Sequence, residues 1–210
     1  MTSLKDSLDS LNYKYKEVAP ELIVVYNFLK DSEIELVLNK IKKLSQSDWE
    51  EHYMTGVSDL AQRKYNRTDI ENLVKEGLVE ITTNWVDKNA GLEYDISGPI
   101  TKRVEEIFSF SSDLLFDGIG TIQRQYDGEK LVEHVDNHAD PSISHAVIMY
   151  INDDYSGGEL FFSNLKIQMT PPAKSMVIFP SGEEYLHGVN APGPGPERYV
   201  LPSFVRHVKK

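Results

Sequence analysis

The order of hydrophobic and polar positions divides the chain into a mostly helical first part and a second part of short strands. Leu22-Ile-Val-Val-Tyr-Asn-Phe-Leu29 is a short apolar run rich in β-branched and aromatic residues, which predicts a buried strand. Ser32 and Glu35 fit a capping box, and the apolar positions after Ser32 recur with helical spacing. We therefore expect a helix over about 32–45.

Two more helices are predicted before the pattern changes. Apolar residues recur with helical spacing along Ile70–Trp85. Ser97-Gly-Pro99 is expected to open the other helix, because a proline in the first turn sacrifices no hydrogen bond, and the apolar stripe follows over Ile100–Phe108. Residues 1–20 are polar and are expected to form a loosely ordered arm, followed by a single domain over 21–210.

From about residue 113 the period shortens to that of strands, separated by Asp-Gly, Gly-Gly and proline-rich turns. The predicted strands cover 118–126, 131–137, 144–152, 158–164, 165–170, 174–180, 185–190 and 198–208. Helices followed by about eight closely spaced strands indicate an α+β fold, in which N-terminal helices support one face of a jelly-roll core. The adjacent glycines Gly157 and Gly158 suit a tight turn that needs positive φ.

Composition narrows the function classes. The net charge is -11 and Lys209-Lys210 is the only basic cluster, which disfavours nucleic acid as a partner. The chain has no cysteine, so a metal would have to be held by histidine and carboxylate. No secretory signal and no membrane-spanning apolar run is visible, so we expect no membrane partner and a cytoplasmic location.

His134 and Asp136 are the strongest candidates for metal ligands. Two residues apart on a strand, they would leave the same face, and together they supply two-thirds of the facial triad that binds non-haem Fe(II). His187 follows an apolar strand and is the candidate for the third ligand. His138 could instead complete a contiguous zinc site, whereas His145 is expected to be a packed strand histidine.

The order of motifs resembles the Fe(II)/2-oxoglutarate dioxygenases, and within them the prolyl 4-hydroxylase-like branch. Tyr126 precedes His134-x-Asp136, Gly157-Gly-Glu-Leu160 follows, and His187-Gly188 leads to Arg198-Tyr-Val-Leu201. Upstream, Asn27-Phe-Leu29 before a helix and the Arg67-Thr68 pair also look like that branch. The resemblance covers about 22–206 and implies a double-stranded β-helix.

The resemblance also implies cofactors and their residues. Fe(II) would be held by His134, Asp136 and His187, and O2 would react beside bound 2-oxoglutarate, with ascorbate as an optional addition. Arg198 suits the 5-carboxylate of 2-oxoglutarate, because a guanidinium binds carboxylate bidentately. Arg206, further along the last strand, is the alternative anchor.

Three other positions take their expected roles from the resemblance. Tyr126 would donate its hydroxyl to 2-oxoglutarate. Trp49 and Arg67 lie in the segment that closes over the active site in relatives, which makes them candidates for substrate contact. Leu131 departs from the pattern, because many relatives have tyrosine three residues before the first metal histidine.

The resulting hypothesis is a 2-oxoglutarate-dependent dioxygenase of the procollagen-proline 4-dioxygenase kind. It would hydroxylate proline in a peptide or protein and release succinate and CO2. The absence of cysteine argues for a compact cytosolic form over the secreted collagen enzymes. Two alternatives stay open, namely a sister dioxygenase acting on a free amino acid or small molecule and a non-catalytic jelly-roll module. The oligomeric state is left open as well.

Overall fold

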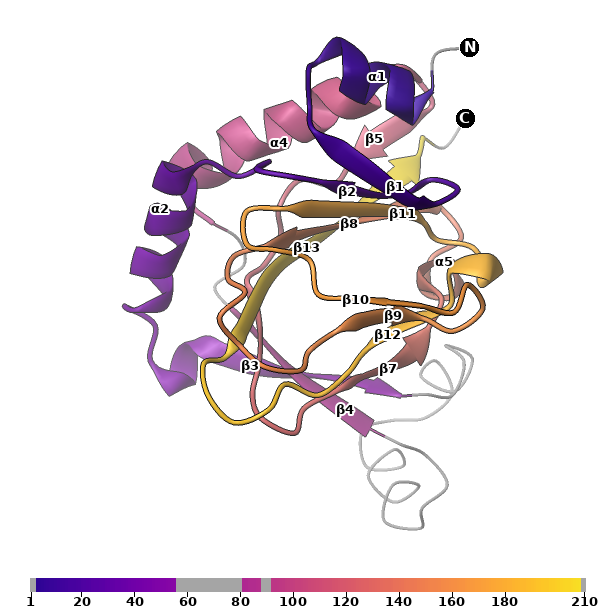
Figure 1. Ribbon diagram of the computed structural model, residues 1–210. Helices are drawn as coiled ribbons and strands as arrows, with labels where there is room; N and C mark the ends of the chain where they lie inside the picture. The colour runs from indigo at the N-terminus through magenta and orange to yellow at the C-terminus, as the bar shows by residue number, and fades with distance from the viewer. Residues whose placement is uncertain (1–2, 56–80, 88–91, 209–210) are drawn as a thin grey trace.

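The computed structural model describes residues 3–55, 81–87 and 92–208, which form two antiparallel sheets that face each other (Figure 1). The larger sheet has the order β1 (Tyr15–Ala19), β2 (Leu22–Val25), β11 (Met176–Pro180), β8 (Ile143–Tyr150), β13 (Arg198–His207), β6 (Gln123–Gln125), β4 (Ile81–Asp87) and β3 (Trp49–Thr55), with β5 (Leu114–Phe116) beside β13. The smaller sheet has the order β10 (Ile167–Met169), β9 (Leu160–Phe162), β12 (His187–Val189) and β7 (Leu131–His134). This is the double-stranded β-helix that was expected.

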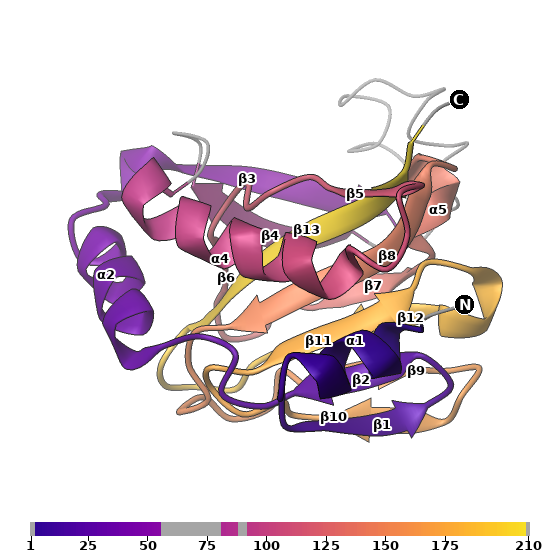
Figure 2. The same ribbon diagram turned by 90° about the horizontal axis from the view of Figure 1, so that it is seen from above.

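Three helices cover the outer face of the larger sheet: α1 (Leu4–Ser10), α2 (Asp31–Ile41) and α4 (Tyr94–Phe108) (Figure 2). The apolar stripe of α4 is buried and packs with outward side chains of β8 and β13, such as Met149 and Leu201. Because β8 is covered by helices on one side and by the smaller sheet on the other, it reads as a nearly continuous apolar run. None of the described helices is long and apolar enough to cross a membrane.

A second core lies between the two sheets and is the one that matters for the functional site. Alternation along β8 turns Ala146 and Tyr150 inward, while Val147 and Met149 face the helices. The inward set also includes Phe162 from the smaller sheet. The interior of the sandwich is therefore lined mainly by large apolar side chains, into which a few polar groups project.

The eight predicted strands of the second half are confirmed, each by one observed strand from β6 to β13. The two glycines at 157 and 158 both have a φ of 66°, as the turn required. The helix predicted over 32–45 is also confirmed as α2. Its N-cap is Lys30, two residues before the expected Ser32, and the Glu33 carboxylate accepts from the backbone N–H of Lys30 at 2.9 Å.

Three expectations for the first half are wrong. Residues 3–19 are not a loose arm but contain α1, capped by Ser3 and Asp6, and β1 paired to β2. The predicted third helix, α4, begins at Tyr94, so Pro99 lies in its second turn. The end of the predicted helix over Ile70–Trp85 is strand β4, paired with β3; the part before Ile81 lies outside the described residues. In β4, cross-strand pairing overrides the helical spacing of the apolar residues.

Candidate metal centre

The two candidate histidines come from neighbouring strands of the smaller sheet. His134 ends β7 and His187 begins β12, and the antiparallel register pairs them directly. Their ring centroids are 4.3 Å apart. Cross-strand partners project from the same face of a sheet, so a separation of 53 positions in sequence becomes direct contact. This pairing brings together two of the predicted ligands.

Asp136 reaches the histidines in a different way from the one predicted. Strand β7 stops at His134, and Asp136 is the first residue of a short helix, α5 (Asp136–Ala139). The alternation argument for a shared strand face was therefore wrong, although the juxtaposition is correct. Asp136 Oδ1 lies 3.4 Å from His134 Nε2, and Oδ2 lies 3.8 Å from His187 Nε2.

The hydrogen bonds of both imidazoles select one tautomer. His134 Nδ1 lies 2.9 Å from the carbonyl of Val132, and His187 Nδ1 lies 2.9 Å from the carbonyl of Tyr185. A carbonyl only accepts, so each Nδ1 carries the proton and each Nε2 keeps a lone pair. Backbone carbonyls that orient ligating histidines in this way are typical second partners at metal sites.

The donor set fits a divalent metal. Within the described part of the chain, His134, Asp136 and His187 are the one group of three metal-binding side chains whose ligand atoms all lie within 4.8 Å of one another. Asp136 Oδ2 is buried and has no hydrogen-bond partner there. A buried carboxylate oxygen without a partner is costly unless a cation takes that place. Two imidazoles and one carboxylate are the ligands of the facial triad that suits Fe(II).

The protonation states agree with that role. Burial, helped by nearby His134, lowers the pKa of His187 to about 4, so the imidazole is neutral near pH 7. Burial by itself would raise the pKa of Asp136. The neighbouring His187 and the interaction with His134 outweigh it and lower the pKa below its ordinary value. Neutral imidazole and ionised carboxylate are the forms that bind metal.

Arg198 is the second functional feature of the interior. It begins β13, is only 2% exposed, and donates from Nη1 to Gln125 Oε1 at 2.6 Å and from Nη2 to the Tyr150 hydroxyl at 3.3 Å. Among the described residues no carboxylate lies within ion-pair distance of it. A buried guanidinium without an anion is expensive, so this site favours an acidic ligand.

The alternative anchor, Arg206, is already neutralised. Its Nε donates to Asp117 at 2.5 Å and its Nη1 to Asp140 at 2.5 Å. Two carboxylates therefore occupy this guanidinium near the far end of β13. The geometry favours Arg198 over Arg206 as the anchor for a carboxylate ligand.

Tyr126 and Trp49 are not brought to the metal ligands. On the outer side of β6, the guanidinium of Arg124 lies 4.0 Å from the Trp49 ring centroid and 4.6 Å from that of Tyr126. The Tyr126 hydroxyl donates to Gln46, at 3.3 Å. Trp49 belongs to the helix-covered core and is 6% exposed. This placement differs from the roles expected for both side chains, and Arg67 lies outside the described residues.

The two rival histidines also stand apart from the triad. His138 is exposed and its Nε2 contacts the Glu183 carboxylate. His145 is on the outer face of β8, where its ring centroid lies 5.5 Å from that of Phe108 and Nδ1 lies 2.8 Å from the Ser144 hydroxyl. Neither belongs to the group of ligand atoms around Asp136.

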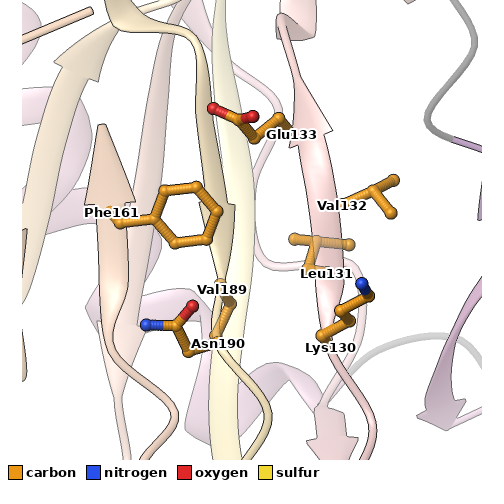
Figure 3. Close-up of a pocket in the computed structure, with 7 residues that line it drawn as sticks. All are labelled: Lys130, Leu131, Val132, Glu133, Phe161, Val189 and Asn190. Carbon is orange, nitrogen blue, oxygen red and sulfur yellow. The ribbon is translucent and has the colours of Figure 1, made fainter. Parts of the chain in front are cut away.

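A separate pocket of about 310 Å³ lies on the smaller sheet (Figure 3). It is lined by Lys130, Leu131, Val132, Glu133, Phe161, Val189 and Asn190. Phe161 leans over β12 at Gly188, where an added Cβ would lie 2.6 Å from its ring. None of the three candidate ligands lines this pocket, so it is not the metal site itself.

The sequence reasoning missed the buried partners of Arg198. Gln125 directly precedes Tyr126, and strand alternation gives the two residues opposite faces. The side chain that contacts Arg198 is therefore Gln125, one position before the tyrosine predicted to bind the cosubstrate. Tyr150 ends a strongly apolar strand, where a tyrosine hydroxyl needs a buried partner. That was the available signal for Tyr150.

The chain is similar in sequence to known oxygenases and hydroxylases. Residues 121–206 match the model of the 2OG-Fe(II) oxygenase superfamily. Prolyl 3-hydroxylase 2 of Rattus norvegicus is 30% identical over 132 residues, which are 50% of this chain but 19% of that protein. The chain thus spans about a fifth of that relative. A PKHD-type hydroxylase of Prochlorococcus marinus (strain MIT 9301) is 27% identical over 202 residues, 89% of this chain and 81% of that protein.

Solved structures share the fold. A viral collagen prolyl hydroxylase from Paramecium Bursaria Chlorella virus-1, in its 2OG complex, has a TM-score of 0.59 and 18% identity over 89% of this chain and 95% of its own. A prolyl hydroxylase from Trichoplax adhaerens, in complex with a peptide fragment of a hypoxia inducible factor, has a TM-score of 0.62 and 16% identity over 98% and 88%.

Proposed function

We propose that this chain is a 2OG-Fe(II) oxygenase, the superfamily whose model residues 121–206 match, and that it is a prolyl hydroxylase acting on a peptide or protein. The product that we propose is 4-hydroxyproline, formed with release of succinate and CO2. Fe(II), 2-oxoglutarate and O2 supply the oxidative chemistry, in which one oxygen atom enters the substrate and the other enters succinate.

One observation carries the proposal more than any other. A group of two histidines and one carboxylate opens into the same sheet interior that holds a buried guanidinium without a carboxylate partner among the described residues. The first element suits Fe(II) with open coordination positions. The second, Arg198, suits the distal carboxylate of a dicarboxylic cosubstrate.

The protein's own contribution is binding, orientation and exclusion of water. Phe162 and Phe179 pack against the His187 ring, with centroids 5.7 Å and 4.6 Å away, and hold it in place. Arg198 is aligned by hydrogen bonds on both sides before a ligand arrives. A site organised in advance loses less free energy on binding, and its dry walls strengthen the charge interactions inside it.

The peptide substrate is supported by the resemblance to prolyl 4-hydroxylases and by the relatives, whose names include prolyl hydroxylases and, for one structure, a peptide ligand. Arg67 and Trp49 remain the candidates of the sequence for substrate contact. The burial of Trp49 in the helix-covered core argues against substrate contact by that side chain.

The test is turnover with a defined substrate set. The protein with Fe(II) and 2-oxoglutarate is incubated with a proline-rich peptide, with the same peptide carrying alanine for proline, and with free proline. We expect the mass of one oxygen to be added to the first peptide alone, with an equal amount of succinate released. Amino-acid analysis then separates 4-hydroxyproline from 3-hydroxyproline, and His187→Ala serves as the inactive control. Oxidation of free proline but not of the peptide would overturn the peptide assignment.

A further inference from the structure

Tyr155 is a buried tyrosine that has no role in the site described so far. It follows β8 in the loop that leads to the glycine pair, and it is 7% exposed. Its hydroxyl is buried and has no hydrogen-bond partner among the described residues. A buried hydroxyl is almost always satisfied in a folded protein, so one without a partner points to a group that binds there.

The hydroxyl belongs to the neighbourhood of Arg198. A Cβ added at Gly158 would lie 2.9 Å from Tyr155 Cε2 and 3.1 Å from Arg198 Cδ, so both side chains pack against the same backbone position. Arg198 Nε is likewise buried without a partner among the described residues. Two buried donors that have no partner among the described residues therefore belong to side chains that pack around the same glycine.

The charge state of Tyr155 suits donation. Burial raises the pKa of its hydroxyl to about 12, against the opposing effect of Arg198, so the proton is retained near pH 7. The Tyr150 hydroxyl already accepts from Arg198 Nη2 and can donate its own proton onward. A carboxylate presents about four acceptor positions, enough for an arginine and two phenols.

We propose that the Tyr155 hydroxyl binds the distal carboxylate of 2-oxoglutarate together with Arg198, and that it makes the site selective for a dicarboxylate over a 2-oxo acid lacking that group. The inference rests on the proposed role of Arg198 as the anchor. The site needs glycine at position 158, because any side chain there would displace the Tyr155 ring or the Arg198 side chain.

The test compares two ligands in Tyr155→Phe, which keeps the ring and removes the hydroxyl. Binding is measured by calorimetry with Mn(II) in place of Fe(II), without turnover. We expect the dissociation constant of 2-oxoglutarate to rise by roughly ten-fold or more, as for a lost hydrogen bond to a charged group. For 2-oxopentanoate, which has the same chain but a methyl group in place of the distal carboxylate, we expect less than a two-fold change, about the scatter of such measurements.

A structural role gives a different pattern. Equal weakening of both ligands, or unchanged binding of 2-oxoglutarate, would overturn the proposal. Tyr13→Phe, whose ring packs beside Phe28 in the helix-covered core, is the matched control and should alter neither ligand. Arg198→Met distinguishes a failure of the Tyr155 assignment from a failure of the Arg198 assignment. If it weakens 2-oxoglutarate binding and Tyr155→Phe does not, only the role of Tyr155 fails; if neither does, the anchor assignment fails.

The unliganded protein gives a second readout. Removing a buried hydroxyl that has no partner removes a desolvation cost, so metal-free Tyr155→Phe should melt at the same temperature as the parent protein or higher. A variant that is at least as stable but binds the cosubstrate more weakly is the signature of a ligand-binding hydroxyl. A large drop in melting temperature would identify Tyr155 as a structural residue instead.

Discussion

Replacing Arg198 by methionine tests the assignment of the cosubstrate anchor. Methionine keeps an apolar stem of similar length and removes the charge. Arg198 is 2% exposed, and its guanidinium donates to the neutral polar groups of Gln125 and Tyr150. Its removal should therefore cost the unliganded protein little, because no buried anion is left behind.

The expected loss appears on binding. A bidentate pair with the distal carboxylate supplies about 3 kcal/mol, counting two hydrogen bonds to a charged group at the low end of their range, so the dissociation constant of 2-oxoglutarate should rise roughly 100-fold. At a 2-oxoglutarate concentration of about 100 times the dissociation constant of the parent protein, the ligand stabilises the parent by about 2.7 kcal/mol and the variant by about 0.4 kcal/mol. For a chain of this size the difference is about 5–9 °C in the ligand-induced shift of melting temperature.

The assay is thermal unfolding with Mn(II), with and without 2-oxoglutarate, followed by the KM for 2-oxoglutarate in turnover. Arg206→Met is the matched control, since that guanidinium is paired with Asp117 and Asp140. It should lose about 1 kcal/mol of stability and no ligand-induced shift. An unchanged shift in Arg198→Met, or loss of the shift in the control alone, would refute the reasoning.

Three further predictions follow from the geometry. His187→Ala should abolish metal binding in equilibrium dialysis, whereas His138→Ala should retain it; retained binding in the first variant would reject the triad. Gly188→Ala should lower the free energy of unfolding, measured in urea, by about 1–3 kcal/mol. The new Cβ would lie 2.6 Å from the Phe161 ring and 2.7 Å from the Leu131 carbonyl oxygen. In the control Gly120→Ala the new Cβ meets nothing within 4 Å, so that variant should be as stable as the parent. Burial lowers the pKa of His145 to about 4. As the pH falls, this histidine therefore takes up its proton in the unfolded chain before it does so in the folded protein. The free energy of unfolding should fall between about pH 6.5 and 4, by at most about 3 kcal/mol. The metal-free His145→Phe variant should lose part of that slope in urea titrations at several pH values; an unaltered slope would exclude this contribution.

Several features were predictable because they depend on local pattern. The alternation that predicts strands acts over a few residues, and every predicted strand after residue 113 has an observed counterpart. The apolar stripe of α4 was likewise visible. Where the first half was mispredicted, long-range pairing decided the structure: Ile81–Asp87 takes the extended form because β3 and β6 lie on either side of it.

The candidate site also has features that the sequence predicts and features that only the fold decides. The sequence alone indicated the ligand types, because a chain without cysteine offers no thiolate and leaves imidazole and carboxylate as the main donors. It also indicated His134, Asp136 and His187 through an ordered motif. It did not supply the helix that begins at Asp136, which turns the carboxylate toward the histidines by a change of direction after the strand.

The choice between Arg198 and Arg206 could be made only from the tertiary structure. The two arginines have the same chemistry and lie on one strand, so neither composition nor spacing separates them. Burial and neighbours do: Arg206 has two carboxylates beside it, and Arg198 has polar but uncharged partners in a nearly dry interior. The free energy of a charge depends on how much water it has lost and which opposite charge replaces it, and both are properties of the folded chain.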